Sequence, residues 1–410
     1  MNVASLIEYP ELLNSYDGFP KDVVQRAKEL LAEIGSIGAY THSQGIPIVR
    51  KRIAQFINGR DGFPADPDSI FCTAGASEGV KRVLDLLISK ESDGIMIPIP
   101  QYPLYTASIT LCGGRAVPYY LDESSNWDLT ERELEKSLKN ALEQNTDVKA
   151  LCIINPGNPT GQCLSESTMK SIVKFCRDNK LVLLADEVYQ ANIYRPSEYP
   201  FHSFKKILKS MGAAYESVQL ISFHSISKGL IGECGRRGGY FECANVNQDV
   251  KDLLYKMASV SLCPPAQGQV ALELMVNPPK PGDASFELFQ KEQSDIYESL
   301  KRRSQKLQGA FNEMEGVCCN PAFGAMYLFP KITLPETAIQ KAKELNYPPD
   351  EFYCLELLEN TGVSFVPGSG FGQQPGTFHF RSTFLPPEET MDTFIKNIKE
   401  FHVEFMAKYK

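Results

Sequence analysis

Short, unbroken runs of hydrophobic residues recur between residues 69 and 243 of the chain. A strand that is covered on both faces of a sheet carries apolar side chains at successive positions, whereas a strand with one wet face alternates apolar and polar residues. The runs therefore indicate buried strands. We predict seven of them, at residues 69–75, 94–100, 116–121, 150–156, 181–187, 218–223 and 238–243.

Segments with helical spacing separate most of these runs. Residues 167–180, for example, bring Met169, Ile172, Val173 and Cys176 to one face of a helix. Strands that alternate with helices of this length are typical of an open α/β sheet. The predicted fold class is therefore α/β, with a large domain in which helices sandwich a mostly parallel, seven-stranded sheet.

The pattern changes where "NPPKPGD" (277–283) interrupts the chain. The next segment is amphipathic with helical spacing, and its apolar positions are Phe289, Ile296, Leu300, Leu307, Phe311 and Met314. We predict a second, smaller α+β domain that is entered through a long helix, with a single core helix as the alternative for this stretch. The predicted division is an N-terminal segment of the small domain, the large domain and the small C-terminal domain, at residues 1–20, 21–285 and 286–410.

Charge and composition narrow the class of function. The 410 residues are enough for two domains, and a charged fraction of 22% is ordinary for a soluble globular protein. The net charge of −8 argues against a nucleic-acid partner, because phosphate binding needs a basic face. No apolar run approaches the roughly 20 residues that span a bilayer, so we expect no membrane association.

The N-terminus and the cysteines favour a cytoplasmic location. Residues 1–13 lack the basic start and apolar centre of a signal peptide, and they lack the arginines of a transit peptide. The eleven cysteines include no CxxC pair. Reduced thiols are therefore expected in place of a disulfide framework or a metal site.

Ligands of open α/β sheets bind beyond the carboxyl ends of the strands, so the residues after each run are the candidates for chemistry. A helical stripe follows the run at 69–75, which places Gly75, Ala76 and Ser77 at a strand-to-helix turn. Small residues leave the backbone N–H groups of such a turn accessible, and the helix dipole favours an anion there. Most turns of this kind bind nothing, so this signal is weak by itself.

Two further strand ends carry polar residues. The run at 150–156 leads into "NPGNPTGQ", which its Asn-Pro pairs make rigid and which has a plain turn as its alternative interpretation. The run at 181–187 ends in Asp186 and Glu187. A carboxylate at the end of a buried strand is costly without a positive partner, so a salt bridge to a cationic ligand atom competes with a simple helix cap. Tyr189 is placed to reach the same ligand.

The fourth strand end contains one lysine among three serines, in "SFHSISKGLIGECGRRGGY" (222–240). Lys228 can form a Schiff base with an aldehyde if burial or a nearby cation lowers its pKa. Arg236 and Arg237 follow and can clamp a phosphate in a bidentate manner. An isolated lysine is usually a surface residue. Here, however, four successive strands are each followed by a group that can bind an anion or a cation, and this favours a functional site.

The strings "NPGNPTG", "LADEVY", "SISKG" and "RGGY" resemble the motifs of the fold-type I, class I/II pyridoxal-phosphate aminotransferases. Longer strings such as "GAYTHSQGI", "PIPQYPLYTASI", "GECGRRGGY" and "VPGSGFGQQPGTFHFR" are similar to those of the alanine aminotransferases, and the likeness extends over essentially the whole chain. Members of that branch usually carry a longer N-terminal arm before the equivalent of "LIEYPELL".

The resemblance implies a pyridoxal 5'-phosphate site with the following roles. Lys228 holds the cofactor as a Schiff base and later moves the proton, and Asp186 pairs with the ring nitrogen. Asn158 and Tyr189 bond the phenolic oxygen of the ring. Tyr102 stacks on the ring face.

The same resemblance implies a phosphate seat. The backbone N–H groups of Ala76 and Ser77 bind the phosphate together with the hydroxyls of Ser77 and Ser225. Arg237 is favoured as the arginine clamp because "RGGY" aligns with the Arg-x-Gly-Tyr pattern of the family, with Arg236 as the alternative.

Two more residues follow from the resemblance. Tyr40 reaches the phosphate across a homodimer interface. Arg381 in "TFHFRST" binds the substrate α-carboxylate together with Asn158, and alternation puts His379 and Thr383 on the same strand face as Arg381. A solvent-facing strand arginine is the alternative from the sequence alone.

The implied reaction is ping-pong exchange of an amino group between L-alanine and 2-oxoglutarate, giving pyruvate and L-glutamate, through the Lys228 Schiff base. The expected partners are therefore small amino-acid and 2-oxo-acid substrates and a second copy of the chain. The alternative is another enzyme of the same fold, such as an aromatic or kynurenine aminotransferase or a lyase like aminocyclopropane-carboxylate synthase. A non-catalytic effector-binding domain is the rival from another class.

Overall fold

A seven-stranded sheet forms the centre of the computed structural model, which describes residues 1–410. The strand order is β1-β7-β6-β5-β4-β2-β3, and β7 alone runs antiparallel to its neighbours. The predicted α/β fold and all seven predicted strands are confirmed. The strands are β1 (Ile70–Thr73), β2 (Asp93–Ile99), β3 (Arg115–Tyr120), β4 (Asp147–Ile154), β5 (Val182–Asp186), β6 (Leu220–Ser225) and β7 (Gly239–Ala244).

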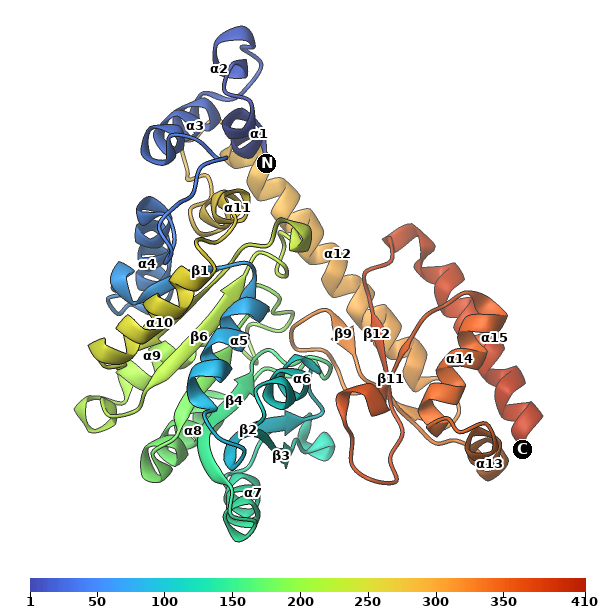
Figure 1. Cartoon of the computed structure of the whole chain (residues 1–410). Helices are drawn as coiled ribbons and strands as arrows, with labels where there is room; N and C mark the ends of the chain where they lie inside the picture. Colours follow the sequence, from blue (N-terminus) through green and yellow to red (C-terminus); the bar gives the residue numbers. More distant parts are fainter.

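Helices cover both faces of this sheet (Figure 1). Successive strand residues face opposite sides, so Leu151 and Ile153 of β4 pack under α7, α8 and α9, whereas Cys152 packs under α5, α6 and α10. Helices α4 and α11 cover the end of the sheet near β1 and β7. These helices are α4 (Pro47–Asp61), α5 (Ala76–Leu87), α6 (Leu104–Leu111), α7 (Glu131–Glu143), α8 (Glu166–Asn179), α9 (Phe204–Ser210), α10 (Gln248–Val260) and α11 (Ala266–Val276).

The local sequence explains why these helices begin and end where they do. The Ser165 hydroxyl caps α8 by accepting a hydrogen bond from the Thr168 N–H, and Lys180 ends the helix in the left-handed region. The predicted apolar face of α8 is buried. Helix α5 starts directly after Gly75, whose φ of 86° turns the chain out of β1. The turn therefore aims the N-terminus of α5 at the carboxyl ends of the strands.

A second hydrophobic core lies beyond α12 (Phe286–Asn312), the long helix that leads to the C-terminal part of the chain (Figure 1). Leu300, Leu307, Phe311 and Met314 belong to this core, as predicted, but Ile296 is exposed because only the second half of α12 reaches the core. The other elements are β8 (Val317–Cys318), β9 (Tyr327–Leu328), β10 (Lys331–Ile332), α13 (Glu336–Glu344), α14 (Pro349–Thr361), β11 (Val366–Pro367), β12 (Phe380–Thr383) and α15 (Met391–Tyr409).

The N-terminal segment packs against helices that flank the sheet. Helix α1 (Asn2–Glu8) buries Leu6 and Ile7 against α3 (Lys21–Ile34) and against Val270 of α11, and α2 (Leu12–Ser15) lies between α1 and α3 in the chain. The apolar face of this segment therefore meets α3 and α11. The division into residues 1–20, 21–285 and 286–410 stays a prediction. No helix combines the length and hydropathy that crossing a bilayer requires.

Candidate active site

A cavity of about 340 Å³ lies at the carboxyl ends of the central strands. Its walls come from the N-terminus of α5, from the residues after β4, β5 and β6, and from β9 and β12 of the C-terminal domain. Tyr40 is 81% exposed and lies outside the cavity. The other ten predicted site residues line it: Ala76, Ser77, Tyr102, Asn158, Asp186, Tyr189, Ser225, Lys228, Arg237 and Arg381.

One end of the cavity is built to hold an anion. Arg237 donates to the Ala74 carbonyl at 2.7 Å and to the Ser77 hydroxyl at 3.3 Å, which holds its guanidinium over the first turn of α5. A Cβ on Gly75 would lie 2.4 Å from Nη2 of Arg237, so only glycine allows this approach. A cation, a hydroxyl and the N-terminus of a 12-residue helix therefore meet at one point.

The two adjacent arginines have different partners. Arg236 is absent from the cavity wall and pairs instead with Glu233 at 3.2 Å and with Glu8 of α1 at 3.7 Å. Of the two arginines that the sequence left open as a phosphate clamp, Arg237 is thus the one at the anion end.

Asp186 ends β5 and lines the same cavity. Its Oδ2 accepts a hydrogen bond from the Tyr105 hydroxyl at 2.9 Å, whereas its Oδ1 is buried and has no partner in the chain. Burial raises the pKa of Asp186 to about 6, whereas the hydrogen bond from Tyr105, the nearby backbone N–H of Val188 and the charge of Lys228 act in the opposite direction. The free oxygen suits a cationic N–H group of a ligand.

Lys228 lies just past β6, with its Nζ 5.8 Å from the centre of the Tyr189 ring. Tyr189 is held from two sides: Nδ2 of Asn158 donates to its hydroxyl at 3.3 Å, and the Tyr327 hydroxyl lies 3.0 Å from it. Burial and the neighbouring Tyr327 raise the pKa of Tyr189 well above its usual value, so the phenol keeps its proton. The lysine therefore faces a cluster of hydrogen-bonding groups across the cavity.

Arg381 enters from β12 of the C-terminal domain. Its guanidinium lies between the rings of Tyr327 and Phe371, 4.4 and 4.7 Å from their centres, and Nη1 donates to Oδ1 of Asn158 at 3.1 Å. Stacking and a fixed hydrogen bond hold the planar group ready for a carboxylate. His379, predicted on the same face as Arg381, lines a neighbouring cavity and bonds to Glu123 at 3.2 Å.

Comparison with known proteins decides the family. The family profile described as "Aminotransferase class I and II" matches residues 12–398. The chain belongs to the class I and II aminotransferases.

Members of this family from several organisms cover nearly all of the chain. A Dictyostelium discoideum protein named probable alanine aminotransferase, mitochondrial, is 53% identical over 100% of this chain and 77% of its own length. An Arabidopsis thaliana protein named glutamate–glyoxylate aminotransferase 2 is 52% identical over 99% of this chain and 85% of its own. The solved structure of an alanine aminotransferase from Pyrococcus furiosus aligns with a TM-score of 0.77 at 26% identity, covering 96% of this chain and 90% of that one.

As a class I and II aminotransferase, the protein uses pyridoxal phosphate as its cofactor. The cavity fits this group at both ends. The unpartnered Oδ1 of Asp186 suits the protonated ring nitrogen, and the seat made by Arg237, Ser77 and α5 suits the phosphate. Lys228 lines the same cavity.

The sequence analysis of this aminotransferase missed two tyrosines that contact predicted site residues. Tyr105 touches Asp186, and Tyr327 touches both Tyr189 and Arg381. Tyr105 lies in the first turn of α6, three residues after the predicted Tyr102, and this nearness in the chain is a signal that the sequence contained. Tyr327 has no such signal, because β9 is two residues long and its place depends on how the C-terminal domain docks.

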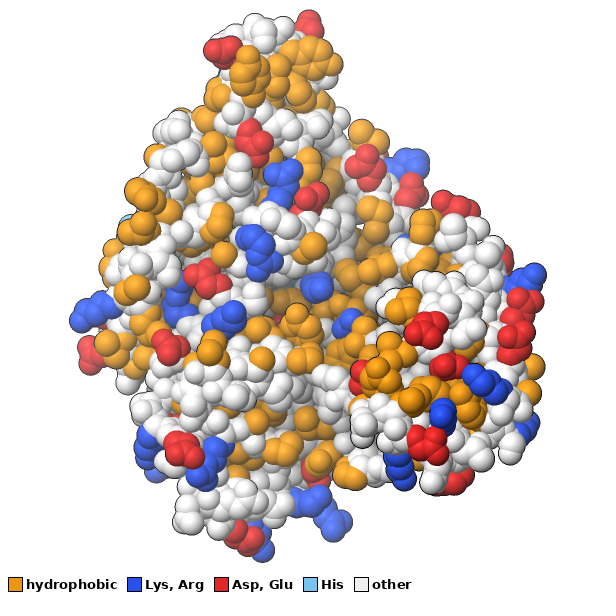
Figure 2. All heavy atoms as spheres, turned by 45° about the vertical axis from the view of Figure 1, so that its right-hand side comes forward, with side chains coloured by type: hydrophobic (Ala, Val, Ile, Leu, Met, Phe, Trp, Pro, Cys, Tyr) orange, Lys and Arg blue, Asp and Glu red, His pale blue; other side chains and the backbone are white.

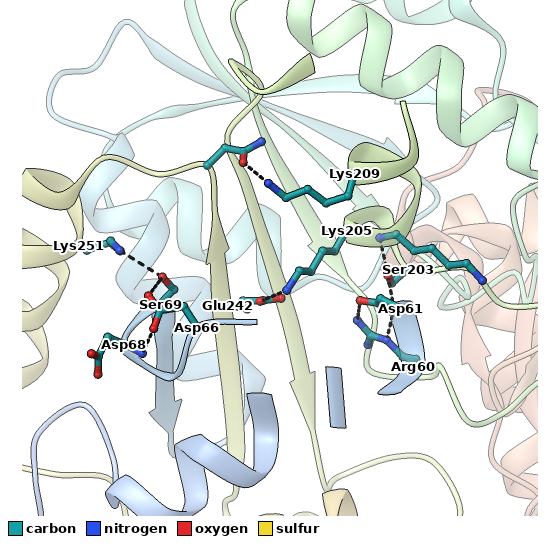
Figure 3. Close-up of polar contacts among 12 residues, drawn as sticks. Arg60, Asp61, Asp66, Asp68, Ser69, Ser203, Lys205, Lys209, Glu242 and Lys251 are labelled. Carbon is teal, nitrogen blue, oxygen red and sulfur yellow. Dashed lines mark hydrogen bonds and ion pairs between the residues drawn. The ribbon is translucent and has the colours of Figure 1, made fainter. Parts of the chain in front are cut away.

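Asp186 and Glu187 are adjacent but have different surroundings: Asp186 lines the cavity, whereas Glu187 lies among buried charged residues away from it. Glu187 points away from the cavity and accepts a hydrogen bond from the Phe204 N–H at 2.7 Å; burial raises its pKa to about 8. Arg60 makes two 2.7 Å bonds to Asp61, which also accepts from Ser203 at 2.8 Å (Figure 3).

A buried ion pair extends this group. The ammonium of Lys205 pairs with the carboxylate of Glu242 on β7, and both side chains are almost wholly buried (Figure 3). These contacts join α4, α9 and β7 on the side of β5 that Glu187 faces, so they brace the strand that carries Asp186.

Proposed function

We propose that this aminotransferase exchanges the amino group between L-alanine and 2-oxoglutarate, giving pyruvate and L-glutamate, by a ping-pong reaction through Lys228. One observation carries the recognition of a substrate by its α-carboxylate. Lys228, Arg237 and Arg381 are the cations of the cavity wall. Once Lys228 and Arg237 serve the cofactor, Arg381 is the cation that is left for the α-carboxylate that all four substrates share. The 53% identical relative named an alanine aminotransferase supports alanine as the amino donor.

Each residue of the cavity has a role in this proposal. Pyridoxal phosphate supplies, when bound, an electron sink for the bond that breaks at the substrate Cα. Lys228 would hold the cofactor covalently and would carry the proton that leaves the substrate Cα. Asp186 would pair with the ring nitrogen, and Asn158 and Tyr189 would bond the phenolic oxygen. Arg381 and Asn158 would receive the α-carboxylate.

The remaining lining residues hold the ends and the face of the cofactor. Ala76, Ser77 and Ser225 bind the phosphate together with Arg237, and Tyr102, which is 47% exposed at the mouth of the cavity, stacks on the ring.

The first test is Lys228→Ala. The variant should lose about 10³-fold or more of its alanine turnover, because it removes both the covalent attachment and the proton carrier. A variant that turns over alanine at the wild-type rate without added amine would overturn the assignment.

A second candidate is glutamate–glyoxylate transamination, which the 52% identical Arabidopsis relative favours by its name. Steady-state kinetics with L-alanine and L-glutamate as donors, each against 2-oxoglutarate, pyruvate and glyoxylate, separates the two. The main proposal requires the highest kcat/KM for alanine with 2-oxoglutarate. A clear preference for glyoxylate as acceptor would replace it by the second candidate.

We further propose a homodimer in which Tyr40 of one copy reaches the phosphate of the other. Tyr40 lies outside its own cavity and is 81% exposed, and Tyr9 and Tyr16 near the N-terminus are 55% and 56% exposed. Hydrophobic side chains gather at this N-terminal tip, at the top of Figure 2. Such a cluster supports a protein–protein contact.

A mixing experiment tests the shared site. A hybrid dimer of a Tyr40→Phe subunit and a Lys228→Ala subunit contains one site with both Lys228 and an intact Tyr40, if the tyrosine crosses the interface. Mixing should therefore raise activity per Lys228 above that of the Tyr40→Phe homodimer. No gain on mixing, with subunit exchange verified by mass, would contradict the proposal.

We place the enzyme in the cytoplasm. All eleven cysteines are free thiols, which supports a reducing compartment. The Dictyostelium relative is named mitochondrial. Cell fractionation with compartment markers tests the location, and recovery with mitochondria would refute it.

A further inference from the structure

Four side chains close a ring of contacts across the two domains. Asn158 and Tyr189 come from the large domain, and Tyr327 and Arg381 come from β9 and β12 of the C-terminal domain. The contacts run from Arg381 to Asn158, from Asn158 to Tyr189, from Tyr189 to Tyr327, and back from Tyr327 to Arg381 by stacking. Tyr327 is the member of this ring that the proposed function leaves without a role.

The donors and acceptors in this ring can be assigned one after another, beginning with Arg381. A guanidinium can only donate, so the atom of Asn158 that faces Arg381 is its carbonyl oxygen. The amide of Asn158 then turns its NH₂ group to Tyr189, whose oxygen must accept. One of the two lone pairs of Tyr189 is thus occupied, and its single proton remains to be placed.

The contact with Tyr327 decides where that proton points. The two hydroxyls lie 3.0 Å apart, with ring planes at 82°, so one of them donates to the other. A phenol that donates gains electron density, and the Arg381 guanidinium 4.4 Å above the Tyr327 ring stabilises that density. The cation over the Tyr189 ring is Lys228, and its Nζ lies farther away, at 5.8 Å from the ring centre. The donor in this pair is therefore Tyr327.

We propose that Tyr327 is a positioning residue that donates its hydroxyl proton to Tyr189 and so leaves the Tyr189 proton free to point into the cavity, at the phenolic oxygen of the cofactor ring. The inference rests on the role proposed for Tyr189. It also gives Tyr327 a second effect, because the same ring holds the guanidinium of Arg381 in place.

The variant Tyr327→Phe removes the hydroxyl and keeps the ring that stacks on Arg381. Without the donor, the Tyr189 hydroxyl is less polarised and donates more weakly, so the phenolic oxygen of the cofactor loses stabilisation of its negative charge. The pH at which the visible absorbance of the holoenzyme changes should rise by about 0.5–1 unit, part of what a hydrogen bond to a charged oxygen is worth. KM for alanine should stay within about twofold, because the stack remains.

Two further variants make the test specific. Tyr189→Phe should raise the same spectroscopic pKa by more, and adding Tyr327→Phe to it should change nothing further, because the second hydroxyl acts through the first. Tyr297→Phe is the matched control: it removes another tyrosine hydroxyl, which donates to the Ile193 carbonyl outside the cavity, and should leave the spectrum unchanged.

The outcomes distinguish this inference from the proposed reaction. An upward shift in Tyr327→Phe that vanishes in the Tyr189→Phe background supports a positioning role. An unchanged spectroscopic pKa, or a shift that persists without the Tyr189 hydroxyl, overturns it and leaves Tyr327 a packing residue. The titration needs no substrate, so it can succeed or fail whichever amino acid the enzyme uses.

Discussion

Replacing Tyr105 by Phe should weaken cofactor binding in a manner that depends on pH. The change removes the hydroxyl that donates to Oδ2 of Asp186 at 2.9 Å and leaves the buried ring in place. The other oxygen of Asp186 has no partner in the chain. The carboxylate would then be buried without a hydrogen bond from a side chain, which favours its protonated form.

The magnitude follows from the value of one hydrogen bond. A bond to a charged group contributes about 1.5–3 kcal/mol, which is about 1–2 pKa units. The pKa of Asp186, which burial already raises to about 6, would move to about 7–8. At pH 7 the ionised fraction of the carboxyl would fall from about nine tenths to between a half and a tenth. Because the cofactor ring nitrogen pairs with the ionised form, its dissociation constant should rise about 2- to 10-fold at pH 7.

The assay is a titration of apoenzyme with pyridoxal phosphate between pH 6 and pH 9. The loss of affinity should be largest at pH 6 and nearly absent at pH 9, where Asp186 is ionised in both proteins. Tyr119→Phe is the control, since it removes a buried hydroxyl that bonds to the Cys152 carbonyl at 2.7 Å. Equal affinity ratios at every pH would refute the argument, because the effect would then not pass through protonation of Asp186.

Three further predictions follow from the site. Arg381→Lys should raise KM for alanine about 10- to 100-fold in steady-state assays and change kcat less, because a lysine keeps the charge and loses the planar group; an unchanged KM would contradict the carboxylate role. Gly75→Ala should lower the affinity for pyridoxal phosphate about 10-fold, because the added methyl group would push against Arg237. Gly59→Ala is the control and should leave the affinity unchanged, because there is open space around Gly59. Equal effects of the two changes would contradict this steric explanation. Glu187→Gln should flatten the pH dependence of stability. Burial holds its pKa in the folded state at about 8, so the folded protein binds more protons than the unfolded chain between about pH 4.5 and 8, and the free energy of unfolding falls as pH rises through that window. Chemical denaturation at pH 5 and pH 8 should show a smaller fall in the variant, and an equal fall would be the contrary result.

The sequence was sufficient to place the strands and the residues at their carboxyl ends. Buried parallel strands need unbroken apolar runs, and the rule that ligands bind beyond them led from those runs to Ala76, Asp186 and Lys228 and to the loop that contains Asn158. The structure brings these residues together in one cavity. The runs are local features of the sequence, so they can be recognised without knowledge of the tertiary structure.

Features that depend on long-range packing were not predictable in this way. The antiparallel direction of β7 leaves no trace in its composition, because a strand covered on both faces is apolar in either direction. Helical spacing marked Ile296 as a core position, but the core does not extend that far along α12. Tyr327 reaches Tyr189 only because the C-terminal domain docks beside the sheet.

The division of the cavity between the two domains has a consequence for partly denatured enzyme. Within one copy, every side chain assigned to the cofactor lies between residues 76 and 237. Arg381, which is assigned to the substrate carboxylate, belongs to β12. If the C-terminal region melts first, the protein should remain yellow, bleach normally with a carbonyl reagent and yet process no substrate. The visible absorbance would then depend only on an intact large domain. Catalytic activity would depend on the contact between the two domains.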